Sequence, residues 1–75
     1  MTAENTIMWE AKAAPGRVAD LVEHVKAAAD PRAQIYRSAD DRVVVIDPVG
    51  RGVSDVPAEL VARAPHVWRF ERVER

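Results

Sequence analysis

The run Val43-Val44-Val45-Ile46 decides the fold of this chain. It consists of four consecutive residues of high β-propensity and ends at Asp47. The run is too short for a helix, and as a strand it is apolar on both faces, so it predicts a strand that is covered from two sides. The chain's own helices can supply one cover, and we expect a second molecule to supply the other.

The size of the chain also favours self-association. It has 75 residues and no cysteine. We expect a single domain over residues 1–75, and its core alone is marginal because so small a chain buries only about 60% of the surface that its unfolded form exposes. The lack of cysteine excludes disulfides and thiolate metal sites, which stabilise many small domains. Oligomerisation is the remaining way to stabilise so small a domain, and a homodimer is its simplest form.

Charge and hydropathy narrow the classes of function. Eleven basic and twelve acidic residues give a net charge of −1, so there is no basic field to attract nucleic acid or anionic lipid. Residues 1–6 lack the positive start and apolar core of a signal peptide, and no apolar stretch reaches membrane-spanning length. We therefore expect a soluble, cytoplasmic protein that binds neither nucleic acid nor membrane.

Hydrophobic periodicity predicts six elements in the order strand, helix, strand, strand, helix, strand. Apolar residues at helical spacing predict a helix that begins near Arg17 and ends at Asp30-Pro31. A second, short helix is expected over residues 57–64, capped by Ser54 or Asp55 and stopped by Pro65. Strands are expected at residues 5–12, 33–38, 42–47 and 66–73.

This order is the βαββαβ layout of ferredoxin-like folds, which belong to the α+β class. The fold has a four-stranded antiparallel sheet of order 4-1-3-2 with two helices on one face. Its central strands are the first and third, and here these are the apolar ones, whereas the second and fourth carry charges suited to sheet edges. Because right-handed crossovers place both helices on one side, the opposite face is left bare.

The bare face predicts a homodimer through the helix-free side of the sheet. Its alternate side chains include aliphatic or aromatic residues of the central strands in whichever register holds. Burial of roughly 400 to 600 Å² of such surface favours association by on the order of 10 kcal/mol before association costs. A partner sheet is the expected cover.

The layout resembles the dimeric α+β barrel superfamily, in which two ferredoxin-like chains pack sheet against sheet around a shared interior. The resemblance rests on element order and on the apolar central strands, and it covers most of the chain. The superfamily includes antibiotic-biosynthesis-type monooxygenases, which need no conventional cofactor, and muconolactone isomerase-like proteins. The resemblance therefore implies a cofactor-independent monooxygenase or isomerase as one alternative. The short second helix departs from the superfamily, whose members usually run longer.

Aromatic residues give the sharpest candidate site. Trp9, His66 and Trp68 belong to the first and fourth strands, which are neighbours in this fold. Together with Tyr36 on the second strand, they are the candidate lining of a ligand pocket. The alternative is that both tryptophans are core or interface anchors and that His66 hydrogen-bonds at a strand start.

The remaining polar residues carry weaker signals. The two histidines lack the spacing of a metal site, and Gly50-Arg51-Gly52 lacks the third glycine of a dinucleotide site, so neither metal nor cofactor is expected. Asp47 is a base if it is desolvated, although an aspartate before proline more often starts a turn. No catalytic residue is assigned. The expected function is a small homodimeric module without chemistry of its own, which binds a small apolar molecule between its sheets.

Overall fold

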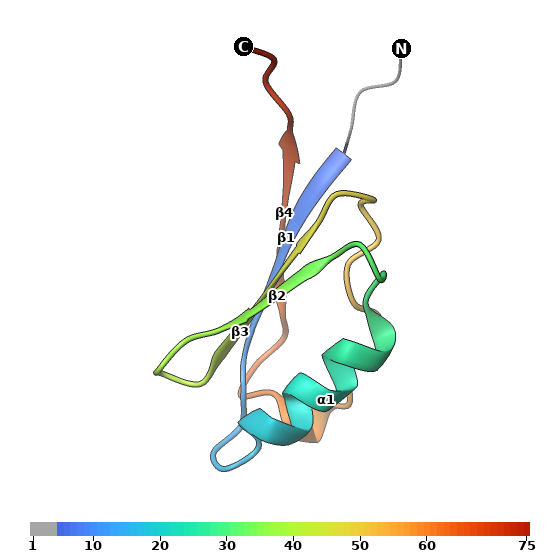
Figure 1. The fold of residues 1–75 in the computed structure, drawn as a ribbon. Helices are drawn as coiled ribbons and strands as arrows, with labels where there is room; N and C mark the ends of the chain where they lie inside the picture. Colours follow the sequence, from blue (N-terminus) through green and yellow to red (C-terminus); the bar gives the residue numbers. More distant parts are fainter. Residues whose placement is uncertain (1–4) are drawn as a thin grey trace.

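The computed structural model describes residues 5–75. Residues 1–4, which belong to the N-terminal stretch expected not to be a signal peptide, lie outside the described part. The chain is an α+β fold built on a four-stranded antiparallel sheet (Figure 1). Its elements are β1 (Asn5–Lys12), α1 (Val18–Ala28), β2 (Gln34–Arg37), β3 (Arg42–Asp47), the 3-10 helix η1 (Ala58–Leu60) and β4 (His66–Glu71). Within residues 5–75, neither helix is long and apolar enough to cross a membrane.

The sheet order is β2-β3-β1-β4, which reads 4-1-3-2 from the β4 edge. The two apolar strands, β1 and β3, pair in the centre, with Trp9 opposite Val45. Burial alternates along β3: Val43 and Val45 have no exposed surface, whereas Val44 and Ile46 are half-buried. Side chains of the buried set point toward α1, and the others point to the helix-free side.

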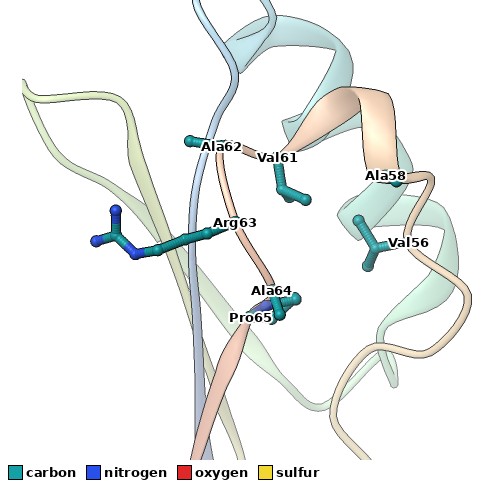
Figure 2. Close-up of a pocket in the computed structure, with 7 residues that line it drawn as sticks. All are labelled: Val56, Ala58, Val61, Ala62, Arg63, Ala64 and Pro65. Atoms are coloured by element: carbon teal, nitrogen blue, oxygen red, sulfur yellow. The ribbon is translucent and has the colours of Figure 1, made fainter.

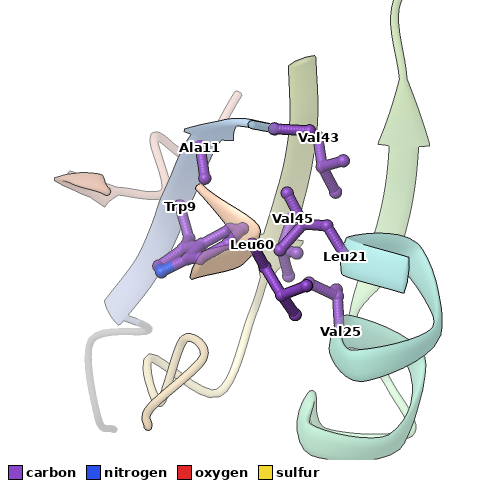
Figure 3. Packing of buried hydrophobic residues seen from close by; sticks show 8 residues of the cluster. Trp9, Ala11, Leu21, Val25, Val43, Val45 and Leu60 are labelled. Carbon is purple, nitrogen blue, oxygen red and sulfur yellow. The ribbon is translucent and has the colours of Figure 1, made fainter. Parts of the chain in front are cut away.

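α1 covers the sheet with one apolar stripe. Leu21 and Val25 lie one turn apart, are fully buried, and pack in a single cluster with residues of both central strands and with Leu60 of η1 (Figure 3). The helix ends where Ala29 adopts an extended conformation, just before Asp30-Pro31, because proline disfavours a helical residue in front of it. α1 contacts β2, β3 and η1, so its cover lies over the half of the sheet away from β4.

The second helix expected over residues 57–64 does not form, and the prediction of a ferredoxin-like fold with two helices is wrong. Only Ala58–Leu60 is helical, and Val61 is already extended, with φ −121° and ψ 147°. Val61 forms a bridge with Ala13 beyond the end of β1, and the N–H of Ala62 donates to the carbonyl oxygen of Lys12 at 2.8 Å. This segment therefore adds to the edge of the sheet instead of lying on its face.

Backbone hydrogen bonding explains the difference. A helix leaves its first four N–H and last four C=O groups without internal partners, which in an eight-residue helix is about half of its backbone polar groups. Pro65 also disfavours a helical conformation at Ala64. Pairing with the end of β1 supplies those partners directly. As a result, all six residues of β4 are exposed, including those on the helix side.

Candidate functional site

The helix-free side of the sheet is the candidate site, and we call it the open face. Strand register assigns its residues, because side chains directly opposite one another share a face. Its members are Gln34 and Tyr36 of β2, Arg42, Val44 and Ile46 of β3, Thr6, Met8, Glu10 and Lys12 of β1, and His66, Trp68 and Phe70 of β4.

Two rows of opposed side chains cross the open face. One row runs Gln34, Ile46, Met8, Trp68, and the other runs Tyr36, Val44, Glu10, His66. The large aromatic side chains stand on the two edge strands, with smaller aliphatic side chains between them. Tyr36 and Phe70 are each 52% exposed and Trp68 is 40% exposed. Exposed large apolar side chains that gather on one face are typical of interaction sites.

Three of the four sequence-predicted site residues lie on the open face. His66 and Trp68 stack on β4 with ring centroids 5.6 Å apart and an interplanar angle of 20°. Tyr36 stands on the opposite edge strand, where its hydroxyl donates to Oε1 of Gln34 at 3.0 Å. The two central strands separate Tyr36 from the stacked pair.

Trp9 does not join this group. It lies opposite Val67, one residue away from Trp68 in register, so its indole points to the helix side and is only 2% exposed. The two tryptophans therefore face opposite sides of the sheet. Adjacent strands bring residues together only if the register also places them on one face, and element order does not specify that register.

A charged pair stands among the apolar side chains of the open face. Nη1 of Arg42 donates to Oε2 of Glu10 at 2.6 Å, and its Nε donates to Asp40 at 3.4 Å. The hydrogen bond to Glu10 is the main reason why the pKa of Arg42 lies above its ordinary value. Lys12 lies directly opposite Arg42, so the two carboxylates also offset a contact between like charges. The Glu10–Arg42 pair is neutral in sum and compatible with a cover.

Asp47 is a buried carboxylate on the helix side, at the end of β3. Its oxygens accept the backbone N–H groups of Val49, Arg51 and Gly52 at 2.8, 3.0 and 2.8 Å. Burial raises the pKa of this carboxyl, but the N–H donors together outweigh that effect and hold the pKa below its ordinary value. Asp47 is therefore an ionised carboxylate that anchors the loop Gly50-Arg51-Gly52, called the glycine loop below. This is the role of a turn residue and not that of a base.

Asp30 anchors the same loop from the end of α1. Its carboxylate accepts hydrogen bonds from the backbone N–H of Arg32 at 2.8 Å, from Nε of Arg32 at 3.1 Å and from Nη1 of Arg51 at 3.5 Å. The hydrogen bonds from Arg32 lower the pKa of the Asp30 carboxyl. Its side chain is 4% exposed, so a ligand cannot reach it without displacing an arginine. This cluster is structural.

An apolar groove of about 400 Å³ lies beside η1 (Figure 2). In Figure 2, Val56 and Val61 face each other across it, and the guanidinium of Arg63 points away. The lining residues are Val56, Ala58, Val61, Ala62, Arg63, Ala64 and Pro65. The groove belongs to the segment that does not form the second helix. It offers van der Waals contacts but no converging polar groups, so it does not support chemistry.

Sequence reasoning found the aromatic part of the open face and missed its aliphatic floor, formed by Met8, Val44 and Ile46. The signal was present in the alternation of β3. Once Trp68 is placed, strand pairing puts Met8 and Ile46 in its row, and Val44 follows two residues before Ile46 on the same face. The missing information was the register between β1 and β4.

No family model, curated protein or solved structure matches this chain. Within residues 5–75, there is no group of three or more histidine, aspartate or glutamate side chains that could hold a metal ion. The small α+β fold with its four-stranded antiparallel sheet, and the open face that it exposes, are thus the basis for a functional assignment.

Proposed function

We propose that the chain is a homodimeric module in which two copies cover each other's open face. The observation that carries the proposal lies in β3. Val43 and Val45 are fully buried by the chain's own helix, whereas the equally apolar Val44 and Ile46 remain half-exposed on the other side. A second open face offers a matching apolar surface, and its Glu10 carboxylate is already paired with Arg42.

The extent of the face fits a dimer of modest affinity. Four strands about 4.8 Å apart and roughly 20 Å long give a footprint of about 400 Å² per copy. Accessible area exceeds a flat footprint, so two copies bury on the order of 1,000 Å² in total, the low end for specific interfaces. Interfaces at this end of the size range are typical of weak or transient association, and we expect a dissociation constant of about micromolar size.

The heights of the side chains on the open face favour binding of a small apolar ligand between the two sheets. Tyr36, Trp68 and Phe70 stand on the edge strands, and the shorter Val44 and Ile46 form the floor between them. Facing sheets pack about 10 Å apart, so tall edge side chains meet first and leave room over the floor. Such apolar space with few polar groups is typical of small-molecule sites. Since Trp9 lies in the core, no observation here favours monooxygenase or isomerase chemistry over binding.

Light scattering after size exclusion tests the association. We expect the wild type to be at least dimeric at about 100 μM. Ile46→Lys places a charge in the open face and should halve the mass at that same concentration. Ala27→Lys, on the exposed side of α1, is the matched control and should leave the mass unchanged. A monomeric wild type, or an unchanged mass for Ile46→Lys with a folded circular dichroism spectrum, would refute the proposal.

Titration with 1-anilinonaphthalene-8-sulfonate tests the ligand space separately. We expect the wild type to bind the apolar rings of this anionic dye, and Val44→Trp to remain associated but bind it far more weakly, because the indole fills the space above the floor. Failure of the associated wild type to bind the dye would remove the ligand and leave the dimer standing.

A further inference from the structure

We propose that β4 is a second surface for self-association, distinct from the open face. In this arrangement, the β4 strands of two copies pair in antiparallel orientation about a two-fold axis at Phe70. Two four-stranded sheets thereby become one sheet of eight strands. The partner is a second copy of this chain, and the contact is made by the strand edge and not by the face used above.

The exposure of β4 is the first observation. Within residues 5–75, β4 is an edge strand that pairs only with β1. All six of its residues are exposed, those on the helix side because no second helix lies over them. Val67 is 51% exposed and Phe70 is 52% exposed. Edge strands are usually protected by charged side chains, proline, a bulge or short length, and the charges of β4 protect it only if they do not pair with those of a second copy. The other edge, β2, has only four residues, whereas β4 has six and contains neither proline nor lysine.

The order of charges around Phe70 is the second observation, and it is self-complementary. When Phe70 lies opposite its symmetry mate, Arg69 lies opposite the partner's Glu71, and the symmetry repeats that pair. Val67 then lies opposite the partner's Val73, which is 84% exposed in the single chain. Opposite charges and apolar pairs directly across a strand pair are stabilising, and like charges are destabilising.

Neighbouring registers lack this match. If the axis moves to Arg69, two arginines face each other, and if it moves to Glu71, two glutamates face each other. A centre at Trp68 brings no opposite charges together, so among these centres Phe70 alone pairs arginine with glutamate and is the one that the charge pattern favours. Because each residue meets a partner residue of the same face, both α1 helices lie on one side and the two open faces form a continuous surface on the other. Edge pairing is thus compatible with face-to-face dimerisation.

Charge exchange in the Ile46→Lys background isolates this contact, since that variant removes open-face pairing. We expect Ile46→Lys to dimerise through β4 only at concentrations well above those at which the open-face dimer forms. Adding Arg69→Glu or Glu71→Arg alone should raise the dissociation constant about 30-fold, because each converts two attractive pairs into two repulsive ones. Combining both exchanges should restore the dissociation constant of Ile46→Lys. Arg69 and Glu71 lie on the helix side, so neither touches the open face.

Disulfide trapping provides a second measurement in a chain that has no native cysteine. Phe70→Cys places two thiols directly opposite each other, at the Cα separation of about 5 Å that a disulfide requires. Val67→Cys is the control, because six residues along the strand separate the two copies, about 20 Å. We expect rapid oxidation to a covalent dimer for the first variant only.

Three results would overturn the edge proposal: a monomeric Ile46→Lys at every concentration, failure of the double exchange to restore association, or equal cross-linking of both cysteine variants. The first of these leaves open-face dimerisation intact, provided that the wild type is dimeric. A monomeric wild type overturns both proposals together.

Discussion

Removal of the Asp47 carboxylate should cost a large part of the stability of the fold. Asp47→Ala leaves three N–H groups without their acceptor, and that of Gly52 is buried beyond the reach of water. An unsatisfied buried donor costs about 1–3 kcal/mol, and the more accessible donors cost less, so the total is about 3 kcal/mol. A chain of this length is stable by about 4–11 kcal/mol. Asp47→Asn keeps one acceptor oxygen and should cost about 1–2 kcal/mol.

Urea unfolding followed by tryptophan fluorescence measures these differences, since Trp9 is in the core. All variants are compared at one protein concentration. Asp55→Asn is the matched control: the side chain is exposed, and asparagine tolerates the left-handed backbone, φ 58°, at that position. It should change stability by less than about 0.5 kcal/mol. A cost below about 1 kcal/mol for Asp47→Ala would contradict the role of the carboxylate as an anchor.

The pH dependence gives an independent test of the same carboxylate. The folded-state pKa of Asp47 lies below the unfolded value of about 3.9, so its ionisation stabilises the fold above that pH, and the contribution is lost as pH falls toward the folded pKa. The stability gap between wild type and Asp47→Asn should therefore be constant near neutral pH and shrink below about pH 4. Other carboxylates are common to both proteins and cancel. A gap as large at pH 3 as at pH 7 would refute the reasoning.

Two further predictions concern the glycine loop and the core. Gly52→Ala should destabilise the fold by about 1–3 kcal/mol more than Gly16→Ala, because both glycines have a positive φ but only at Gly52 does an added Cβ meet Cδ1 of Ile7 at 2.7 Å. Equal costs in urea unfolding would mean that the contact is relieved by movement of Ile7. Leu21→Ala should cost about 2–5 kcal/mol, since its side chain is fully buried. Val22→Ala, at a half-buried position of the same helix, should cost clearly less.

The elements that sequence patterns predicted well are those with strong local signals. The stripe through Leu21 and Val25 marks α1, and the alternation in the central strands marks which side chains lie beneath it. The second helix failed because its local signals, a capping residue and a run without breakers, were weaker than a competing partner. The backbone of Val61 and Ala62 pairs instead with the end of β1, and no local pattern in residues 57–64 predicts that pairing.

The candidate site shows the same limit. Tyr36, His66 and Trp68 are aromatic residues on strands, and that much is visible in the sequence. Their common face depends on register, and so does the separation of Trp9 from Trp68, because a shift of one residue moves a side chain to the other side of the sheet. The role of Asp47 was within reach, since an aspartate before a glycine-containing turn commonly accepts its N–H groups.

The absence of the second helix links the two proposed interfaces physically. In the expected fold, a helix would cover the helix side of β4 and leave only the open face to be buried by a partner. Here Val61 and Ala62 extend the sheet, and β4 is bare on both faces, with Val67 on one side and Trp68 and Phe70 on the other. A chain that buries so little of itself has a marginal core. Association through both the face and the edge would compensate for the missing layer, with the open face supplying apolar area and the charges flanking Phe70 selecting the register.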